Sequence, residues 1–139
     1  MGPHFGKEDM DIISATFVES IDVRQAAGGG PTRIDLLGVM FSVAAPSPPP
    51  VTLAPHLVVL VRCRPSEPGF AALEVIFRDE AGEQVAKSVM PFQVEPGKFS
   101  YRLVKGDLSY ETYGTIEAHC NIDGGPVTVV PLTLVPPVS

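Results

Sequence analysis

The sequence predicts an all-β fold, an antiparallel two-layer β-sandwich of about eight strands. Its 139 residues are the size of one domain, with room for a single hydrophobic core. Fifteen prolines run from Pro3 to Pro137, alongside 13 glycines, and they leave few windows long enough for an interior helix. In most remaining windows apolar and polar residues alternate with the period of a half-buried strand. We therefore expect one turn-rich β domain over residues 11–139, preceded by a flexible leader at residues 1–10.

Residues 11–23 predict the first strand, which ends in a bend where Glu19 interrupts the alternation. The apolar positions of its repeating face are Ile13, Ala15 and Phe17. The glycine-rich residues 25–31 then predict a mobile surface loop.

Residues 32–43 predict a second strand whose apolar face changes part-way along. Ile34 and Leu36 occupy even positions, whereas the later apolar residues occupy odd ones. These later residues are Leu37, Val39, Phe41 and Val43. Such a switch indicates a β-bulge near Gly38 or a strand that crosses between sheets. The prolines of residues 46–50 then predict a stiff, extended connector.

Three strands are expected in the middle of the chain. Residues 56–64 carry apolar side chains on both faces, which predicts a strand buried on both sides at one end. Residues 71–78 alternate clearly and lead through Asp79-Glu80-Ala81-Gly82 into residues 84–92. The four-residue link predicts a hairpin turn, because the spaced acidic pattern of a calcium loop is missing. Lys87 and Pro91 indicate that residues 84–92 form a sheet edge.

The C-terminal part predicts three more strands. The first carries Phe99, Tyr101 and Leu103 at alternate positions. Residues 115–122 show the cleanest alternation in the chain and place Ile116, Ala118, Cys120 and Ile122 on the inward face. A turn at residues 123–126 leads into residues 127–135, where Pro131 removes a ladder donor and so indicates an edge or a bulge.

The two cysteines, Cys63 and Cys120, are too few for a disulfide scaffold. Their separation of 57 residues is similar to that of the bridge in immunoglobulin domains, but the chain has no tryptophan, and Ala118 stands where those domains have tyrosine. We therefore expect an immunoglobulin-like sandwich in general architecture only. Both cysteines lie on apolar faces and are expected to be buried, reduced thiols, with a disulfide between the sheets as the alternative.

Several of these segments follow one another in a recognisable order. They are residues 13–18, the run from Leu36 to Phe41, the proline-rich connector with the strand at 57–64, the hairpin at 77–82 and the late strand that ends at 122–124. In this order residues 11–135 resemble a family of small uncharacterised bacterial proteins, each predicted to be a single β-sandwich domain of unknown function. The resemblance implies the fold and a bacterial, intracellular origin. It brings no catalytic residue, since its motifs specify backbone shape.

Composition and charge exclude several classes of function. The formal net charge is −6 and the ten basic residues are dispersed, so the chain lacks the basic stripe of a nucleic-acid-binding protein. A negative surface also disfavours anionic lipid, and no apolar run is long enough for a membrane helix. The first residues lack the apolar segment of a secretory signal, which predicts a cytoplasmic location.

The best polar cluster lies on the strand at residues 115–122. Glu117, His119 and Asn121 project from one face, spaced about 7 Å apart. They could bind a sugar hydroxyl or a metal, although a zinc site would need a further histidine or thiolate. The alternative is an ordinary solvated strand face. Tyr110 and Tyr113 could add an aromatic edge, and the alternative for them is packing of their connection onto the sandwich.

No combination of residues specifies a reaction. The serines lack a nucleophile elbow, the three histidines are dispersed, and no metal or cofactor site is expected. We therefore expect a non-enzymatic module that binds a protein partner or associates with itself through an edge strand. The alternative is a small-ligand module for carbohydrate or a divalent metal, built on Glu117, His119, Asn121 and the two tyrosines.

Overall fold

The structure, a computed structural model, describes residues 10–25, 32–65 and 69–137. Residues 1–9 of the expected leader, residues 26–31 of the predicted glycine-rich loop, residues 66–68 and residues 138–139 lie outside it. Within these ranges all regular secondary structure is β, as predicted, and no helix is present that could cross a membrane. The strands are β1 (Met10–Val18), β2 (Ser20–Gln25), β3 (Thr32–Leu37), β4 (Ser42–Ala44), β5 (Val51–Leu53), β6 (His56–Cys63), β7 (Phe70–Arg78), β8 (Gln84–Gln93), β9 (Phe99–Lys105), β10 (Leu108–Tyr110), β11 (Gly114–Ile122) and β12 (Thr128–Val135).

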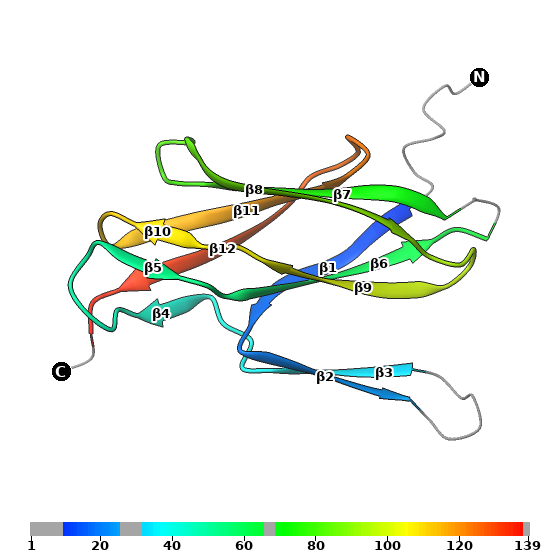
Figure 1. Ribbon diagram of the computed structural model, residues 1–139, viewed down its shortest axis with the longest axis horizontal. Helices are drawn as coiled ribbons and strands as arrows, with labels where there is room; N and C mark the ends of the chain where they lie inside the picture. The colour runs from blue at the N-terminus through cyan, green and yellow to red at the C-terminus, as the bar shows by residue number, and fades with distance from the viewer. Residues whose placement is uncertain (1–9, 26–31, 66–68, 138–139) are drawn as a thin grey trace.

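The strands form the predicted two-layer sandwich (Figure 1). One layer is the three-stranded sheet β1-β6-β9, and the short pair β5-β10 lies beyond the ends of β6 and β9. The other layer is the five-stranded sheet β4-β12-β11-β7-β8. The prediction of a wholly antiparallel arrangement is wrong at one place, because β4 runs parallel to β12. The chain reaches that position from another sheet, so the direction of β4 is not set by a hairpin.

The structure describes twelve strands where about eight were expected from spacing. All eight predicted segments contain strands, but two of them are split. The segment at 11–23 breaks at Glu19 into β1 and β2, and the segment at 32–43 breaks after Leu37 into β3 and β4. The other two additions, β5 and β10, are three-residue strands that pair with each other and lie between the predicted strands.

The core lies between the two layers. Its largest fully buried side chains include Phe17, Leu57, Phe77 and Leu132, which come from both sheets. Among the described residues no polar or charged residue is fully buried. Gly106 lies against the ring of Phe77, where an added Cβ would stand 3.3 Å from the ring edge. The core is therefore almost wholly apolar, and most of the polar side chains lie on the outer faces.

The prediction that Ile13 lies on the inner face of the first strand, with Ala15 and Phe17, is wrong. Ile12 opposes Val61 and Ser14 opposes Leu60, so Ile13 is the extra residue of a β-bulge and is 48% exposed. The bulge shifts the side-chain parity by one, which places Ile12 on the core side before it and Ala15 and Phe17 on the core side after it. Met10, the last residue of the expected leader, is also part of β1 and is buried.

Strand β9 has the predicted alternation, but its apolar side faces outward. Val104 lies opposite Leu57 and points into the core, so Phe99, Tyr101 and Leu103 lie on the outer face of the sheet. Arg102 lies on the inner side, and its guanidinium stacks over the Phe92 ring at 4.7 Å. Removal from water lowers the pKa of Arg102.

The predicted change of face near Gly38 is confirmed as a crossing between sheets. Gly38 has φ +66°, a conformation that favours glycine, and the chain leaves the pairing of β3 here to join β12 through β4. Leu37, Val39 and Phe41 do not share the inward position of Val43, however, and all three are exposed. Met40 packs on the core instead and bridges to Phe17.

The turns and edges agree with the predictions. Asp79 to Gly82 forms the β7–β8 turn, and β8 is an edge of its sheet. Asp123 and Gly124 both have positive φ, as in a type I′ hairpin turn. Pro131 lies in the part of β12 that β4 does not reach. The proline-rich connector joins β4 to β5 in the other layer, but the prediction that it is extended is wrong, because residues 46–50 form successive bends. Cys63 and Cys120 are both buried thiols.

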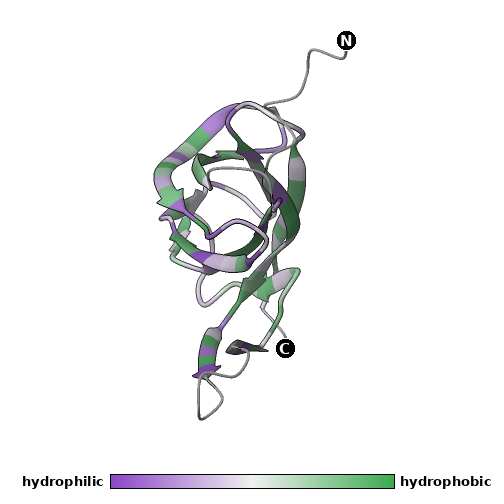
Figure 2. Cartoon of the chain, turned by 90° about the vertical axis from the view of Figure 1, so that its right-hand side faces the viewer, coloured by the Kyte–Doolittle hydropathy of each residue, from purple (hydrophilic) through white to green (hydrophobic). Residues whose placement is uncertain are grey.

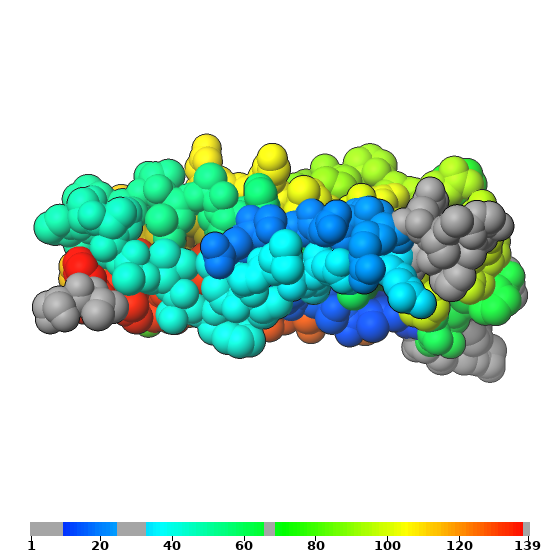
Figure 3. Space-filling view, turned by 90° about the horizontal axis from the view of Figure 1, so that it is seen from below, coloured from blue at the N-terminus to red at the C-terminus, as the bar shows by residue number. Residues whose placement is uncertain are grey.

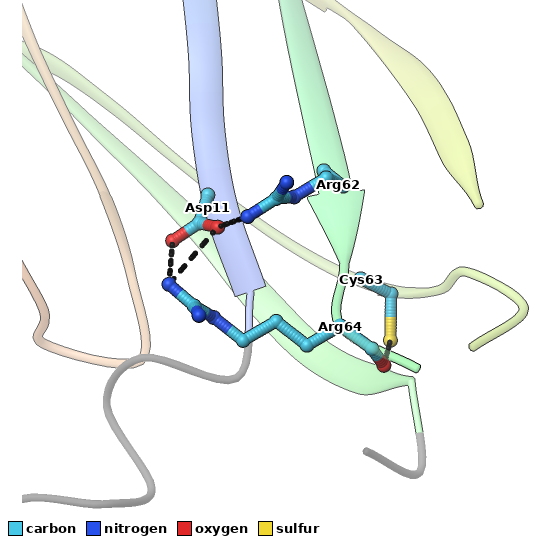
Figure 4. A network of polar contacts seen from close by, with 4 residues as sticks. All are labelled: Asp11, Arg62, Cys63 and Arg64. Atoms are coloured by element: carbon cyan, nitrogen blue, oxygen red, sulfur yellow. Dashed lines mark hydrogen bonds and ion pairs between the residues drawn. The ribbon is translucent and has the colours of Figure 1, made fainter. Parts of the chain in front are cut away.

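Ion pairs fix the start of β1 to β6 on the outer face (Figure 4). Asp11 accepts from Arg62 at 2.7 Å and from the more distant Arg64 at 3.4 Å. Cys63 lies between these two arginines and donates to the carbonyl of Arg64 at 3.5 Å. Because all three charged side chains are partly exposed, this cluster orients the strand end rather than adding much stability.

Strands β2 and β3 form a hairpin that stands apart from both layers, and we call these two strands the arm (Figures 1 and 2). In the described part of the chain they pair only with each other. Seen from below, the blue and cyan surface of the arm runs along the middle of the molecule (Figure 3). The two ends of the arm lie side by side, because the amide of Glu19 donates to the carbonyls of Leu37 and Gly38 at 3.0 and 3.1 Å.

Candidate functional site

The polar strip predicted on residues 115–122 lies on the outer face of β11. Glu117, His119 and Asn121 alternate with Ala118 and Cys120, which are buried in the core. Since the intervening residues point inward, the three polar side chains must point outward. Strand β11 has neighbours on both sides, β7 and β12, so the strip crosses the middle of the five-stranded sheet.

The three residues of the strip do not converge on one point. His119 Nε2 lies 3.2 Å from Glu117 Oε1, so these two residues form a pair. Asn121 is engaged elsewhere: its Nδ2 donates to Glu74 Oε1 at 3.0 Å, and its Oδ1 accepts from the amide of Gly124 at 2.9 Å. The strip thus divides into a Glu117–His119 pair and Asn121, which links β11 to Glu74 on β7 and to the turn at Gly124.

Glu74 is kept ionised by its neighbours across the sheet. The hydrogen bond from Asn121 is the main cause of its lowered pKa, and the ammonium of Lys87 at 3.6 Å adds to the effect. All these groups are partly exposed, so the network is a surface arrangement. Its side chains form hydrogen bonds and an ion pair with one another, so they do not line a binding pocket.

The two predicted tyrosines lie in different environments. Tyr110 is buried, and its hydroxyl donates to the carbonyl of Leu132 at 2.7 Å. Burial raises its pKa well above the ordinary value for a tyrosine. Tyr113 is 38% exposed at the surface. The sequence left open whether these tyrosines pack onto the sandwich or form an aromatic edge. Tyr110 packs onto the sandwich, and of the two only Tyr113 has a ring exposed to solvent.

Two adjoining hollows lie around the β7–β8 turn. One, of about 420 Å³, is lined by the turn and by the segment that carries Tyr113, and the other includes Glu117 and His119. Asp79 and Glu80 border both, but the Asp79 carboxylate already accepts from the amides of Ala81 and Glu83 at 3.0 and 2.9 Å. Among the described residues no three potential ligands gather as a metal site requires. The hollows therefore offer a few hydrogen-bonding groups at an open surface.

The arm is a second candidate, and the sequence reasoning missed it. Each of its strands alternates, so one face is apolar and the other is charged. The apolar face consists of Ile21, Val23, Ile34 and Leu36, and the charged face carries Asp22, Arg24, Arg33 and Asp35. The signal was present as two matched alternations around the glycine-rich loop, but the proposed strand boundaries of 11–23 and 32–43 concealed a separate hairpin.

The charges of the arm are incompletely paired within the chain. Arg24 binds Asp35 through two contacts, Nε to Oδ2 at 2.8 Å and Nη2 to Oδ1 at 2.9 Å. Directly opposite pairs carry like charge, Asp22 facing Asp35 and Arg24 facing Arg33. Like charges in such positions destabilise a two-stranded ladder. Among the described residues neither Asp22 nor Arg33 has an ion-pair partner.

No protein-family model matches the chain, and no curated protein sequence matches it either.

Proposed function

We propose that this chain is a non-catalytic protein-interaction or assembly module of a bacterial cytoplasmic protein, and that the arm is its binding element. The observation that carries the proposal is the amphipathic arm, which projects from a sandwich whose own core is complete without it. A two-stranded hairpin is marginally stable by itself in water. A partner bound at the open edge of the arm or over its apolar face would stabilise it.

Exposed apolar side chains at the base of the arm support this assignment. Leu37 is 52% exposed and Phe41 is 65% exposed, with Val39 exposed between them. Val23 adds an exposed side chain on the arm itself. Isolated surface hydrophobics are common, but a run along one segment is typical of an interaction site.

The small-ligand alternative has less support. Of its five residues, Tyr110 is buried and Asn121 is engaged by Glu74 and Gly124, which leaves the Glu117–His119 pair and Tyr113. A thermal-shift screen of the chain against sugars and divalent ions, repeated with His119→Ala, tests it. A ligand-dependent shift that disappears in the variant would favour this alternative over the proposed function.

The proposed function is tested by shortening the arm. Residues 20–37 are replaced by Asn-Gly, which can join Glu19 to Gly38 because these residues are already hydrogen-bonded. Chemical cross-linking in extracts of the source cells identifies candidate partners, and each complex is then rebuilt from purified components. We expect complexes of the full chain to be lost in the shortened variant and kept in Lys105→Asp, a charge-changing control on β9.

Equal binding by the full and shortened chains would contradict the assignment to the arm. Thermal unfolding of both proteins must accompany the test. A similar Tm for the two is expected, since no residue of the arm belongs to the core.

A further inference from the structure

The outer edge of β3 is an open edge whose charges alternate in sign. β3 pairs with β2 on one side, and among the described strands none lies on its other side. Its central residues are Arg33, Ile34 and Asp35. Open edges of native sheets are usually protected by a charge of one sign, a proline or a bulge. A strand with one charge of each sign around an apolar residue is not protected against its own copy.

This sequence is complementary to itself in an antiparallel arrangement. When two copies of β3 pair around a two-fold axis at Ile34, Arg33 of each copy lies opposite Asp35 of the other, and the two Ile34 residues face each other. Opposite charges in facing positions stabilise a ladder, and the symmetry makes two such pairs at once. Asp35 can accept this second guanidinium while it holds Arg24, because a carboxylate has about four lone-pair sites.

We propose that the partner of the arm is a second copy of this chain, joined through antiparallel pairing of β3 with β3. The inference rests on the proposed function and identifies its partner. The resulting four-stranded ribbon places the Asp22–Asp35 pair of one copy beside the Arg33–Arg24 pair of the other. The like-charge contacts within each arm are thereby neutralised across the interface, and the uncommitted Arg33 gains a carboxylate.

The edges at β8 and β1 lack this property. Strand β8 has Lys87 as its sole charge and Pro91 in its length, which are ordinary protections against pairing. Strand β1 is interrupted by the bulge at Ile13. The second edge of the arm, β2, has the sequence Asp22-Val23-Arg24 and is also self-complementary, but β3 offers the more apolar strand, with Ile34, Leu36 and Leu37.

Charge reversal tests the pairing. Arg33→Asp gives β3 two negative charges, and Asp35→Arg gives it two positive charges. Sedimentation equilibrium over a range of concentrations measures the dimer dissociation constant of the full chain and of each variant. We expect each variant alone to raise Kd by about tenfold or more, because two attractive pairs become repulsive. An equimolar mixture of the two variants restores dimers, since each then faces its complement.

Two controls keep the result specific. Asp22→Arg reverses a charge on β2, one strand away from the interface, and is expected to weaken the β3 dimer far less than Arg33→Asp does. Lys105→Asp on β9 is expected to leave the dimer intact. Circular dichroism confirms that each variant keeps its fold. Loss of the dimer in Asp22→Arg with no effect of Arg33→Asp would overturn the β3 interface.

A full chain that stays monomeric at every concentration would also overturn this inference. If such a monomer still forms an arm-dependent complex with a different protein, the proposed function stands and only the second-copy partner is wrong. If the arm supports neither kind of complex, both proposals fail.

Discussion

The outer face of β11 and the arm follow the same alternating pattern, yet they differ in what surrounds them. On β11 the apolar half of the pattern is buried against the opposite layer, and the polar half is satisfied by Glu74 and by the Glu117–His119 contact. On the arm the apolar half is only partly covered, and Asp22 and Arg33 have no ion pair among the described residues. Alternation thus specifies which residues share a face, whereas the neighbouring elements decide whether that face is complete. The incomplete face is the better candidate for binding.

The largest expected contrast comes from truncating one apolar residue in each region. Phe77→Ala removes a fully buried ring and should lower the free energy of unfolding by about 3–5 kcal/mol. Val23→Ala on the arm should change it by less than about 0.5 kcal/mol, since the side chain is exposed. Urea unfolding of monomeric protein at low concentration measures both. Similar losses for the two variants would show that the arm is part of the folded core.

A second contrast concerns pH, because the sandwich buries an ionisable thiol and the arm does not. Burial raises the pKa of Cys120 from 9.0 to about 12. Between these values the unfolded chain releases a proton that the folded chain retains, so stability is full below pH 9 and falls as the pH rises towards 12. The loss attributable to this group is at most about 1.4 kcal/mol per pH unit. Unfolding of the chain and of Cys120→Ala at several alkaline pH values should show a shallower decline in the variant, and parallel curves would contradict the assignment.

Removal of one buried hydrogen bond should have a smaller effect. Tyr110→Phe deletes the donor to the Leu132 carbonyl while it keeps the ring in place. The expected loss is about 1–2 kcal/mol, because the carbonyl remains buried without that partner. Tyr113→Phe is the matched control at the surface and should be neutral. A neutral Tyr110→Phe would mean that the carbonyl finds another donor.

The smallest expected effect lies in the polar network of the five-stranded sheet. Asn121→Ala removes the main cause of the lowered Glu74 pKa, so that pKa should rise towards its ordinary value. Stability should change by less than about 1 kcal/mol, because the groups are partly exposed. Titration of Glu74 by NMR measures the shift, and Lys87→Ala provides the comparison with a weaker contributor. An unchanged Glu74 pKa in Asn121→Ala would show that another neighbour holds the carboxylate.

Much of the fold could be predicted from the sequence, because turn residues and alternation are local signals. The hairpin at Asp79–Gly82, the edge position of β8 and the change of face near Gly38 all follow from residue types near them, although a bulge and a crossing at Gly38 were not distinguished. The orientation of a face could not be predicted in the same way. At Ile13 a single extra residue reverses the pattern, and on β9 the apolar side chains face outward because Val104 takes the position opposite Leu57.

In the candidate site, too, local contacts could be predicted from the sequence and non-local contacts could not. Glu117 and His119 are two residues apart on one strand, so their contact follows from alternation alone. The engagement of Asn121 by Glu74 depends on the register between β11 and β7, and the burial of Tyr110 depends on the pairing of β10 with β5. Both are non-local facts, separated in the chain by dozens of residues. The arm was missed for a different reason: the bend at Glu19 was predicted, but the residues after it were not expected to form a strand of their own.

Because Glu19 is hydrogen-bonded to Gly38, the arm is an insertion between β1 and β4 whose two ends already meet. Selection for folding acts on the core residues, none of which lies in the arm. If the arm is the binding element proposed above, substitutions in it are selected for their effect on binding far more than for their effect on folding, because sites distant from the core contribute independently to stability. Among relatives of this chain, the arm should change in length and charge faster than the sandwich, and the same body could carry arms of different specificity.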